Sequence, residues 1–327
     1  MPRQADVDAR TALTQAVVAH RRPPLARLLE PKGLGRYRGL GEMFDAVDRL
    51  VARGARVEEV GRSVRGEPLL MLSLGAPTPD ARTRTSVVLA GVHPNEWIGV
   101  EVGLALLERL LREDLGARSV VAFPIVNPDG VLEVEMMLRS GRRRFIRHNA
   151  HGVDLNRNFD ASWDRKGIGQ RILRRLFASG PRPGSEPEVE AIAHALSARR
   201  IDRAVSLHSF GGAVLYPSSH SWLPVADAAE HRLWAKHVAY NADRRRPYRA
   251  IQGAWFSWGF TASGLELDWF HDRHGALSLL VECSRGGAGL RPSRLLSPFA
   301  WFNPPRIEDT TGPLVEALLP FVRGDAI

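Results

Sequence analysis

The amino-acid sequence predicts a single α/β domain with helices on both faces of a mostly parallel or mixed sheet. Two observations predict this fold class. Continuous apolar runs such as residues 85–92 (TSVVLAGV) are typical of strands that are buried on both faces. Segments with apolar residues at helical spacing alternate with these runs over most of the chain. The composition agrees, since 44% of the 327 residues are apolar and 25% are charged, as in globular proteins with a large core.

The first part of the chain contains several Pro and Gly residues, so residues 1–40 are expected to form a partly irregular arm before a domain at 41–327. Turn residues at Arg65-Gly66 and at Asn127-Pro128-Asp129-Gly130 then separate regular segments. The elements expected here are a helix at 41–51, paired strands at 57–61 and 68–74, a strand at 85–92, a helix at 96–112 and a strand at 119–126.

The second part of the chain continues the alternation. Ser185 and Glu188 stand in capping-box register, which predicts a helix that begins there and runs to about residue 199. The further expected elements are a strand at 204–207, a helix at 223–242, a strand at 277–281 and a last helix at 311–323.

The net charge of +9 comes almost entirely from arginine, because only Lys32, Lys166 and Lys236 are lysines. The arginines are spread along the chain, whereas nucleic-acid binders more often concentrate charge on one element. We therefore expect no nucleic-acid partner, although attraction to anionic substrates or surfaces stays open. No window approaches 18 consecutive apolar residues, so no membrane span is expected.

The single cysteine, Cys283, excludes an intrachain disulfide framework. The N-terminus lacks the apolar core and small-residue cleavage site of a secretory signal, so the expected compartment is the cytoplasm. Cys283 follows Glu282 in a predicted strand, and adjacent strand residues face opposite ways. It is therefore expected to be a buried structural thiol that points away from Glu282.

Polar side chains follow three of the predicted strands. His93 and Glu96 come after the strand at 85–92, His208 after that at 204–207, and Glu282 after that at 277–281. Ligands bind outside the carboxyl ends of strands in such sheets. Two histidines and a carboxylate form a catalytic zinc site that leaves a position for water. Taken one at a time, each residue could equally be a hydrogen-bonded surface group.

Five motifs, in this order, resemble the zinc carboxypeptidases of the carboxypeptidase A/B type over roughly residues 40–320. The glycine-containing segment 61–66 (GRSVRG) is similar to the opening hairpin of that family. The resemblance implies a three-layer α/β/α sandwich around a mixed, mostly parallel twisted sheet of about eight strands. The motifs are His93-Pro94-Asn95-Glu96-Trp97, Asn127-Pro128-Asp129-Gly130, residues 152–159 (GVDLNRNF), Ser206-Leu207-His208-Ser209 and Val281-Glu282.

The same resemblance implies a role for each matching residue. His93, Glu96 and His208 match the ligands of one zinc ion, and Glu282 matches the residue that transfers a proton from water to the leaving amine. Asn156 and Arg157 match the pair that binds the terminal carboxylate of the substrate, although an ion pair of Arg157 with Asp154 or Asp160 is an alternative. Arg147 matches the arginine that polarises the scissile carbonyl, with Arg142, Arg143 and Arg144 close by.

The substrate pocket departs from the family at one position. Phe260 stands where the family has a tyrosine over the substrate carboxylate, and a phenyl ring cannot donate a hydrogen bond. Tyr240 and Tyr248 are possible substitutes. Leu267 matches the residue that selects the terminal side chain and favours an apolar or aromatic one, while the flanking Glu266 and Asp268 leave a basic preference open.

These residues predict a zinc-dependent hydrolase that cleaves a peptide or amide bond next to a free carboxylate. The 92 residues before His93 leave no room for a globular inhibitory prodomain, so an intracellular enzyme with a narrow substrate range is expected. The expected substrate is a small peptide or an acyl-amino acid. An amidase or deacylase with the same zinc site is the nearest alternative, and a non-catalytic binding protein is a more distant one. The sequence leaves the oligomeric state open.

Overall fold

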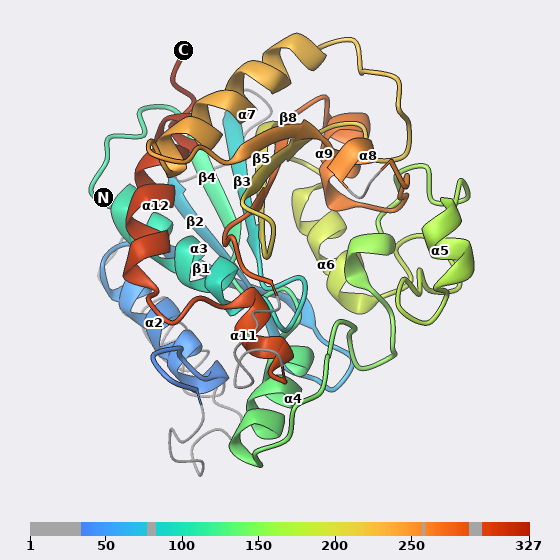
Figure 1. Cartoon of the computed structure of the whole chain (residues 1–327). Coiled ribbons are helices and arrows are strands. Elements are labelled where there is room, and N and C mark those ends of the chain that lie inside the picture. Colours follow the sequence, from blue (N-terminus) through green and yellow to red (C-terminus); the bar gives the residue numbers. More distant parts are fainter. Residues whose placement is uncertain (1–33, 77–82, 257–258, 288–295) are drawn as a thin grey trace.

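Eight strands form one mixed, twisted sheet in the computed structural model, which describes residues 34–76, 83–256, 259–287 and 296–327 (Figure 1). The spatial order is β1-β2-β4-β3-β5-β8-β6-β7. The strands are β1 Arg56–Arg62, β2 Pro68–Gly75, β3 Arg84–Ala90, β4 Ser119–Phe123, β5 Arg200–His208, β6 Ala213–Tyr216, β7 Arg249–Gln252 and β8 Leu277–Glu282.

The centre of the sheet is parallel and its flanks are antiparallel. Strands β4, β3, β5 and β8 run parallel to one another. The pairs β1–β2, β2–β4 and β6–β8 are antiparallel, and β6–β7 is parallel. The predicted mixed, mostly parallel sheet of about eight strands is thus confirmed. The parallel centre matters most for function, because the carboxyl ends of β3, β5 and β8 meet at one edge.

Side chains along each central strand alternate between two apolar layers. On β3, Val88 and Ala90 pack toward one face, whereas Val87 and Leu89 pack toward the other. The first face is covered by α2 Leu40–Ala52, α3 Trp97–Leu110, α7 Ala228–Ala242 and α12 Glu308–Arg323. The second is covered by α6 Pro187–Leu196 and α9 Glu266–His274. The structure is therefore the predicted three-layer α/β/α sandwich.

Two local predictions are wrong. The segment Asn127-Pro128-Asp129-Gly130 begins helix α4 (Pro128–Arg139): Asn127 is its N-cap, and the Asn127 side chain accepts a hydrogen bond from the Gly130 N–H. The capping box at Ser185 and Glu188 does not form, because α6 has Glu186 as its N-cap and the Ser185 hydroxyl donates to Glu186 Oε1. The remaining short helices are η1 Leu155–Arg157, α5 Ile168–Ile172, α8 Gly253–Phe256 and α11 Pro298–Phe302.

Most of the predicted N-terminal arm, residues 1–33, lies outside the described residues. The described end of this segment packs against the C-terminal part of the chain. Leu34 and Tyr37 are buried, and the Tyr37 hydroxyl donates a 2.7 Å hydrogen bond to the Pro304 carbonyl. Helix α2 begins at Leu40, one residue before the start predicted for the first helix.

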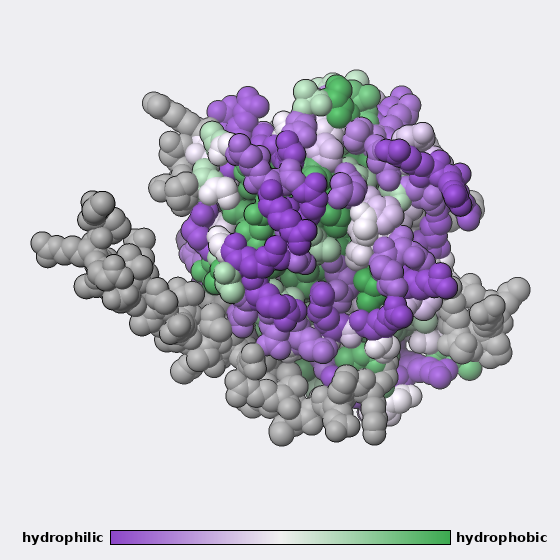
Figure 2. Space-filling view, turned by 90° about the vertical axis from the view of Figure 1, so that its left-hand side faces the viewer, coloured by the Kyte–Doolittle hydropathy of each residue, from purple (hydrophilic) through white to green (hydrophobic). Residues whose placement is uncertain are grey.

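Hydrophilic residues cover most of the described part of the face that carries α2 and α12, and hydrophobic residues appear there only in small patches (Figure 2). Among the described residues, no helix combines the length and hydropathy that a membrane crossing needs.

Candidate active site

The site residues come from the carboxyl ends of three neighbouring parallel strands. His93 and Glu96 lie in the loop after β3, His208 is the last residue of β5, and Glu282 is the last residue of β8. His208 and Glu282 are paired across the β5–β8 ladder. Parallel pairing therefore brings together residues that lie almost 190 positions apart in the sequence.

The loop after β3 is held in place from both sides. The Asn303 amide donates to the Asn95 carbonyl at 2.7 Å, and its oxygen accepts from the Ile98 N–H at 2.9 Å. The Trp97 ring nitrogen donates to the Pro94 carbonyl. Glu96 is the N-cap residue of α3, so its side chain starts from a fixed backbone position.

Two imidazole nitrogens and one carboxylate converge on a single point. His93 Nδ1 lies 2.9 Å from Glu96 Oε1, and His208 Nδ1 lies 3.0 Å from Glu96 Oε2. The two Nδ1 atoms are 3.1 Å apart. All three residues are buried, and their ligand atoms lie within 4.8 Å of one another. This donor set suits a zinc ion, which prefers nitrogen and carboxylate oxygen ligands in fourfold coordination.

The far side of each imidazole faces a second carboxylate. His93 Nε2 lies 3.0 Å from Asp154 Oδ1, and His208 Nε2 lies 2.6 Å from Glu266 Oε1. Such outer carboxylates orient metal-binding histidines with Nδ1 as the ligand atom. Sequence reasoning missed these two contacts. The only available signal was the place of Asp154 and Glu266 beside residues that had been singled out.

The charges of the site fit a divalent cation. Four carboxylates face two guanidinium groups, which leaves two negative charges uncompensated when the carboxylates are ionised. Burial opposes ionisation of Glu96, but the two histidines outweigh it and lower the pKa of Glu96 to about 2. Burial likewise disfavours charged His208, but Glu266 and Glu96 raise the pKa of His208 to about 10. The groups counted are Glu96, Asp154, Glu266, Glu282, Arg147 and Arg157.

Glu282 lines the same cavity as the metal ligands, and one of its carboxylate oxygens has no hydrogen-bond partner among the described residues. Its Oε2 is buried and has no hydrogen-bond partner in the described part of the chain. Burial, and next the negative charge of Glu96, raise the pKa of Glu282 to about 8. A buried unpaired carboxylate oxygen is unfavourable by itself, so this arrangement is typical of a group that handles protons. The adjacent Cys283 is fully buried in the apolar layer on the side of α7 and α12, as expected.

Arg147 lines the same cavity as Glu282. Its Nε donates to Asp154 Oδ2 at 2.8 Å, and its guanidinium lies 5.6 Å from the centre of the Phe177 ring. Arg142 and Arg144 are exposed and line a separate hollow beside Met136. Among these arginines, the structure places Arg147 at the site.

Asn156 and Arg157 lie in η1 and reach the cavity together. Arg157 stacks 5.1 Å from the centre of the Phe177 ring, and its Nε is buried without a partner in the described residues. The alternative ion pair is not formed, because Asp154 pairs with Arg147 and Asp160 is exposed. The guanidinium of Arg157 therefore has an unused N–H donor that can bind an anionic group.

The cavity has a volume of about 230 Å³ and an apolar end. Leu265 lines it, whereas Leu267 does not and packs in the same apolar cluster as Leu265, Leu215 and Leu280. The reason is that α9 begins at Glu266, and the helical turn directs Leu267 into the core. The other apolar residues of the lining are Phe177, Phe210, Leu215, Phe256, Phe260, Ala262, Leu280 and Phe302.

Phe260 lies at the cavity wall and is 53% exposed, which leaves it accessible at the entrance. The described residues of the lining include no tyrosine. Tyr240 is exposed on α7, and the Tyr248 hydroxyl donates to the Cys283 carbonyl at 2.8 Å. Neither of these tyrosines replaces the hydrogen-bond donor that is missing at position 260.

The two acids beside Leu267 do not line the cavity. Glu266 contacts His208, and Asp268 accepts hydrogen bonds from the Ser219 N–H and lies 3.2 Å from His220 Nδ1. The Ser219 hydroxyl does line the cavity and has no partner within the described residues. The end of the cavity is therefore apolar apart from one uncharged hydroxyl.

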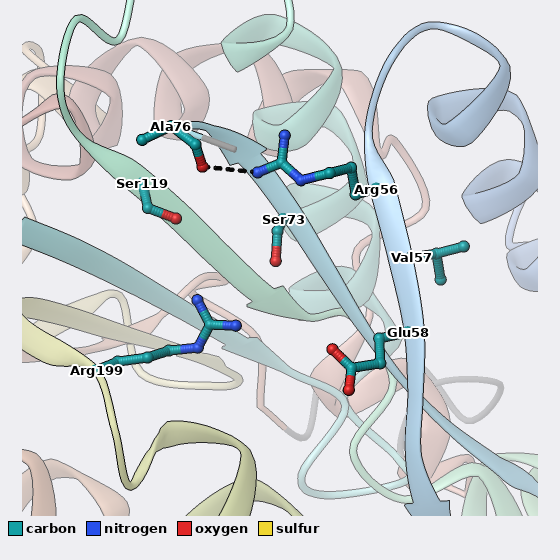
Figure 3. Close-up of a pocket in the computed structure, with 7 residues that line it drawn as sticks. All are labelled: Arg56, Val57, Glu58, Ser73, Ala76, Ser119 and Arg199. Atoms are coloured by element: carbon teal, nitrogen blue, oxygen red, sulfur yellow. Dashed lines mark hydrogen bonds between the residues drawn. The ribbon is translucent and has the colours of Figure 1, made fainter. Parts of the chain in front are cut away.

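A second hollow of about 320 Å³ lies near the starts of β4 and β5, away from the metal ligands (Figure 3). Arg56 donates to the Ala76 carbonyl there, and Glu58 and Arg199 supply charges of opposite sign. This hollow contains no histidine, cysteine or unpaired buried carboxylate among its described lining residues. The chemistry therefore belongs to the smaller cavity at the carboxyl ends of the strands.

The chain is similar in sequence or fold to several known hydrolases. Carboxypeptidase A5 of Homo sapiens is 27% identical over 274 residues, which cover 79% of this chain and 62% of that protein. The chain thus spans less than two thirds of that relative. Carboxypeptidase A of Helicoverpa armigera has a similar fold, with a TM-score of 0.71 and 19% identity over 98% of this chain and 82% of that one. The murein-tripeptide amidase of Escherichia coli O157 gives a TM-score of 0.50 and 22% identity over 84% and 95%.

A family model described as zinc carboxypeptidase matches residues 42–306, which include every candidate site residue. The match covers most of the chain, and the ligand group His93, Glu96 and His208 lies within it. The chain therefore belongs to the zinc carboxypeptidase family.

Proposed function

We propose that this protein is a zinc-dependent hydrolase that removes the C-terminal residue of a small peptide by cleaving the bond next to its free carboxylate. One observation carries the proposal. A single cavity contains three metal ligands, an unpaired Glu282 oxygen and an Arg157 guanidinium with unused donors. These groups supply the metal, the proton acceptor and the carboxylate-binding group that the reaction needs.

The residues divide the chemistry between them. A zinc ion bound here supplies a water whose pKa falls from about 15.7 to about 7 and a charge that polarises a carbonyl oxygen. Glu282 accepts a proton on Oε2 and delivers it to the leaving amine, a role typically worth about 10² to 10⁴ in rate. Arg147, fixed by Asp154, stabilises negative charge that develops on the carbonyl oxygen.

Substrate selection follows from the cavity walls. Asn156 and Arg157 bind the terminal carboxylate, and the fork of Arg157 permits two parallel hydrogen bonds. Leu215, Leu265 and Leu280 surround the terminal side chain, so an apolar or aromatic residue is preferred. A basic terminal residue is disfavoured, since neither Glu266 nor Asp268 reaches the cavity.

The second candidate function is cleavage of an amide bond in an N-acyl amino acid or a cell-wall or biosynthetic peptide. The likeness in fold to the murein-tripeptide amidase supports this candidate. Phe260 also supports this candidate. Its ring lies at the entrance of the cavity and, without a hydroxyl, cannot donate a hydrogen bond to the substrate there. The proposal also includes a cytoplasmic location, supported by the single buried cysteine, and a narrow substrate range, supported by the small cavity.

The test compares hydrolysis of matched substrates by mass spectrometry. Peptides ending in Phe or Leu with a free carboxylate should be shortened by one residue, whereas the same peptides with a C-terminal amide should remain intact. N-acyl amino acids measured beside tripeptides separate the two candidates. The control is Glu282→Gln, which should lower kcat by about 10² or more. Equal cleavage of the free and amidated peptides would contradict the proposal.

A further inference from the structure

We propose that Glu266 is a positioning residue of the metal site, which holds His208 in the orientation for metal binding and strengthens the affinity of the site for zinc. The inference rests on the zinc site of the proposed function. It adds a residue that has no assigned role there, since the expected role of this segment concerned the terminal side chain of the substrate. The contacts of Glu266, its charge and its position in the fold support this role.

The contacts of Glu266 define the orientation of the imidazole. Glu266 Oε1 lies 2.6 Å from His208 Nε2, and both side chains are fully or almost fully buried. The Ser206 hydroxyl donates to the same oxygen at 2.9 Å and lies 3.0 Å from His208 Nε2. Ser206 and His208 are two residues apart on β5, so they project from the same face of the strand. The ring is thus held at one edge by two groups.

This arrangement selects the tautomer of His208. A carboxylate beside Nε2 keeps a ring proton there, so Nδ1, which lies close to Glu96 and His93, is the nitrogen that gives up its proton to bind a metal. Asp154 does the same for His93. Each histidine ligand therefore has its own outer carboxylate, and the pair of Glu266 and His208 is the shorter of the two contacts.

Glu266 also supplies negative charge close to the metal ligands. Its Oε2 is buried and has no hydrogen-bond partner among the described residues, so neighbouring positive charge must stabilise it. The two arginines of the site leave two negative charges uncompensated, and a divalent cation balances them. Without the charge of Glu266, only one remains, and a divalent cation is held less strongly.

The position of Glu266 at the start of α9 connects the metal site to the substrate site. Glu266 is the first residue of the helix, where an acidic side chain is favoured by the helix dipole. Its backbone N–H donates to Asn156 Oδ1 at 3.3 Å. The same residue therefore fixes a metal ligand through its side chain and a proposed carboxylate-binding residue through its backbone.

The experiment measures the zinc dissociation constant by competition with a chromophoric chelator. Glu266→Gln keeps the size of the side chain and removes its charge, and its dissociation constant should rise about 10- to 100-fold. The absorption bands of the cobalt-substituted protein should change with it, because the orientation of His208 changes. The matched control is Glu188→Gln, a fully buried carboxylate on α6 whose loss should leave zinc affinity within about twofold.

Unchanged zinc affinity and an unchanged cobalt spectrum in Glu266→Gln would overturn the inference. Circular dichroism of the metal-free variant checks that it is folded. If the Glu266→Gln variant is not folded, the Glu266→Asp variant is measured instead, because its shorter side chain keeps the charge but moves it away from His208. Wild-type zinc affinity in Glu266→Asp would contradict the role of Glu266 in positioning. A wild-type protein that binds zinc but cleaves no substrate contradicts the proposed function and leaves this inference standing.

Discussion

At the scale of single residues, the site works by leaving a few buried polar atoms without partners. Glu282 Oε2, Arg157 Nε and the Ser219 hydroxyl are all buried and unpaired in the described part of the chain. Native proteins rarely tolerate such atoms, because each costs about 1–3 kcal/mol. All three residues line one cavity, and the proposed function would complete these atoms with a proton, a carboxylate and a substrate side chain.

Zinc binding is expected to release about two protons per chain at pH 7. In the metal-free protein His208 has a pKa of about 10 and Glu282 a pKa of about 8, so both hold a proton at pH 7. The metal displaces the first and its charge lowers the pKa of the second. Affinity should therefore weaken as the pH falls below about 10, and more steeply below about 8. Calorimetry in buffers of different ionisation enthalpy measures the protons released.

Glu282→Gln provides the control for this count, because its side chain cannot hold a proton. It should release about one proton fewer than the wild type, with zinc still bound. Release of no protons by the wild type, or of equal numbers by the two proteins, contradicts the assigned protonation states.

Ser219→Ala should change the preference between terminal Tyr and terminal Phe. The unpaired Ser219 hydroxyl lies in an otherwise apolar lining, where it can bond the phenol of a tyrosine. A net hydrogen bond is worth about 0.5–1.5 kcal/mol, so the ratio of kcat/KM for Tyr over Phe should fall about 2- to 13-fold. Steady-state kinetics on two peptides that differ only in this residue give the ratio. An unchanged ratio would show that the hydroxyl does not contact the substrate.

At the scale of helices and strands, the loops at the carboxyl edge depend on helix starts. Asn127 is fully buried, and its side chain caps α4 through the Gly130 N–H and donates to the His148 carbonyl at 3.1 Å. The segment leading to Arg147 is thereby tied to the start of α4. Helix starts at α3, α4 and α9 thus anchor the parts of the chain that carry Glu96, Arg147 and Glu266.

Asn127→Ala should lower the free energy of unfolding by about 1–3 kcal/mol, because it removes a cap and the hydrogen bond to the partly buried His148 carbonyl. Chemical denaturation of the zinc-free protein followed by circular dichroism measures the difference. Asp114→Ala is the control, since its bond to the Gly116 N–H is exposed, and it should change the value by about 0.5 kcal/mol or less. Equal effects of the two substitutions would contradict the role of Asn127.

The sequence predicts best those strands that form continuous apolar runs of six or more residues. Strands β2, β3 and β8 are continuous apolar runs, and their predicted bounds agree with the structure within two residues. Strands β6 and β7 were missed because each has only four residues, and those of β7 are also mostly half-exposed. Helix α9 (ELDWFHDRH) was missed because its polar residues obscure the helical spacing.

The residues of the candidate site also differ in how well the sequence predicts them. His93, Glu96, His208 and Glu282 could be found because they stand at the ends of recognisable strands. Asp154 and Glu266 could not, since they contact histidines 61 and 58 positions away and nothing local marks the contact. The sequence did not reveal that Leu265 lines the cavity and Leu267 does not, because the start of α9 was not predicted.

At the scale of the whole molecule, the parallel centre of the sheet concentrates function at one edge. Strands β3, β5 and β8 are adjacent, so their ends bring metal ligands and proton acceptor together without any long loop. The second hollow, near the starts of β4 and β5, lacks this chemistry in its described lining. The central claim is therefore that His93, Glu96 and His208 together hold one zinc ion beside Glu282.

Anomalous X-ray diffraction from crystals of the zinc-loaded protein tests this claim most directly. Data collected on both sides of the zinc absorption edge should give one strong peak per chain, about 2.0–2.2 Å from His93 Nδ1, His208 Nδ1 and a Glu96 oxygen. Absence of a peak at this point in zinc-saturated crystals, or a peak bound by other residues instead, would contradict the account.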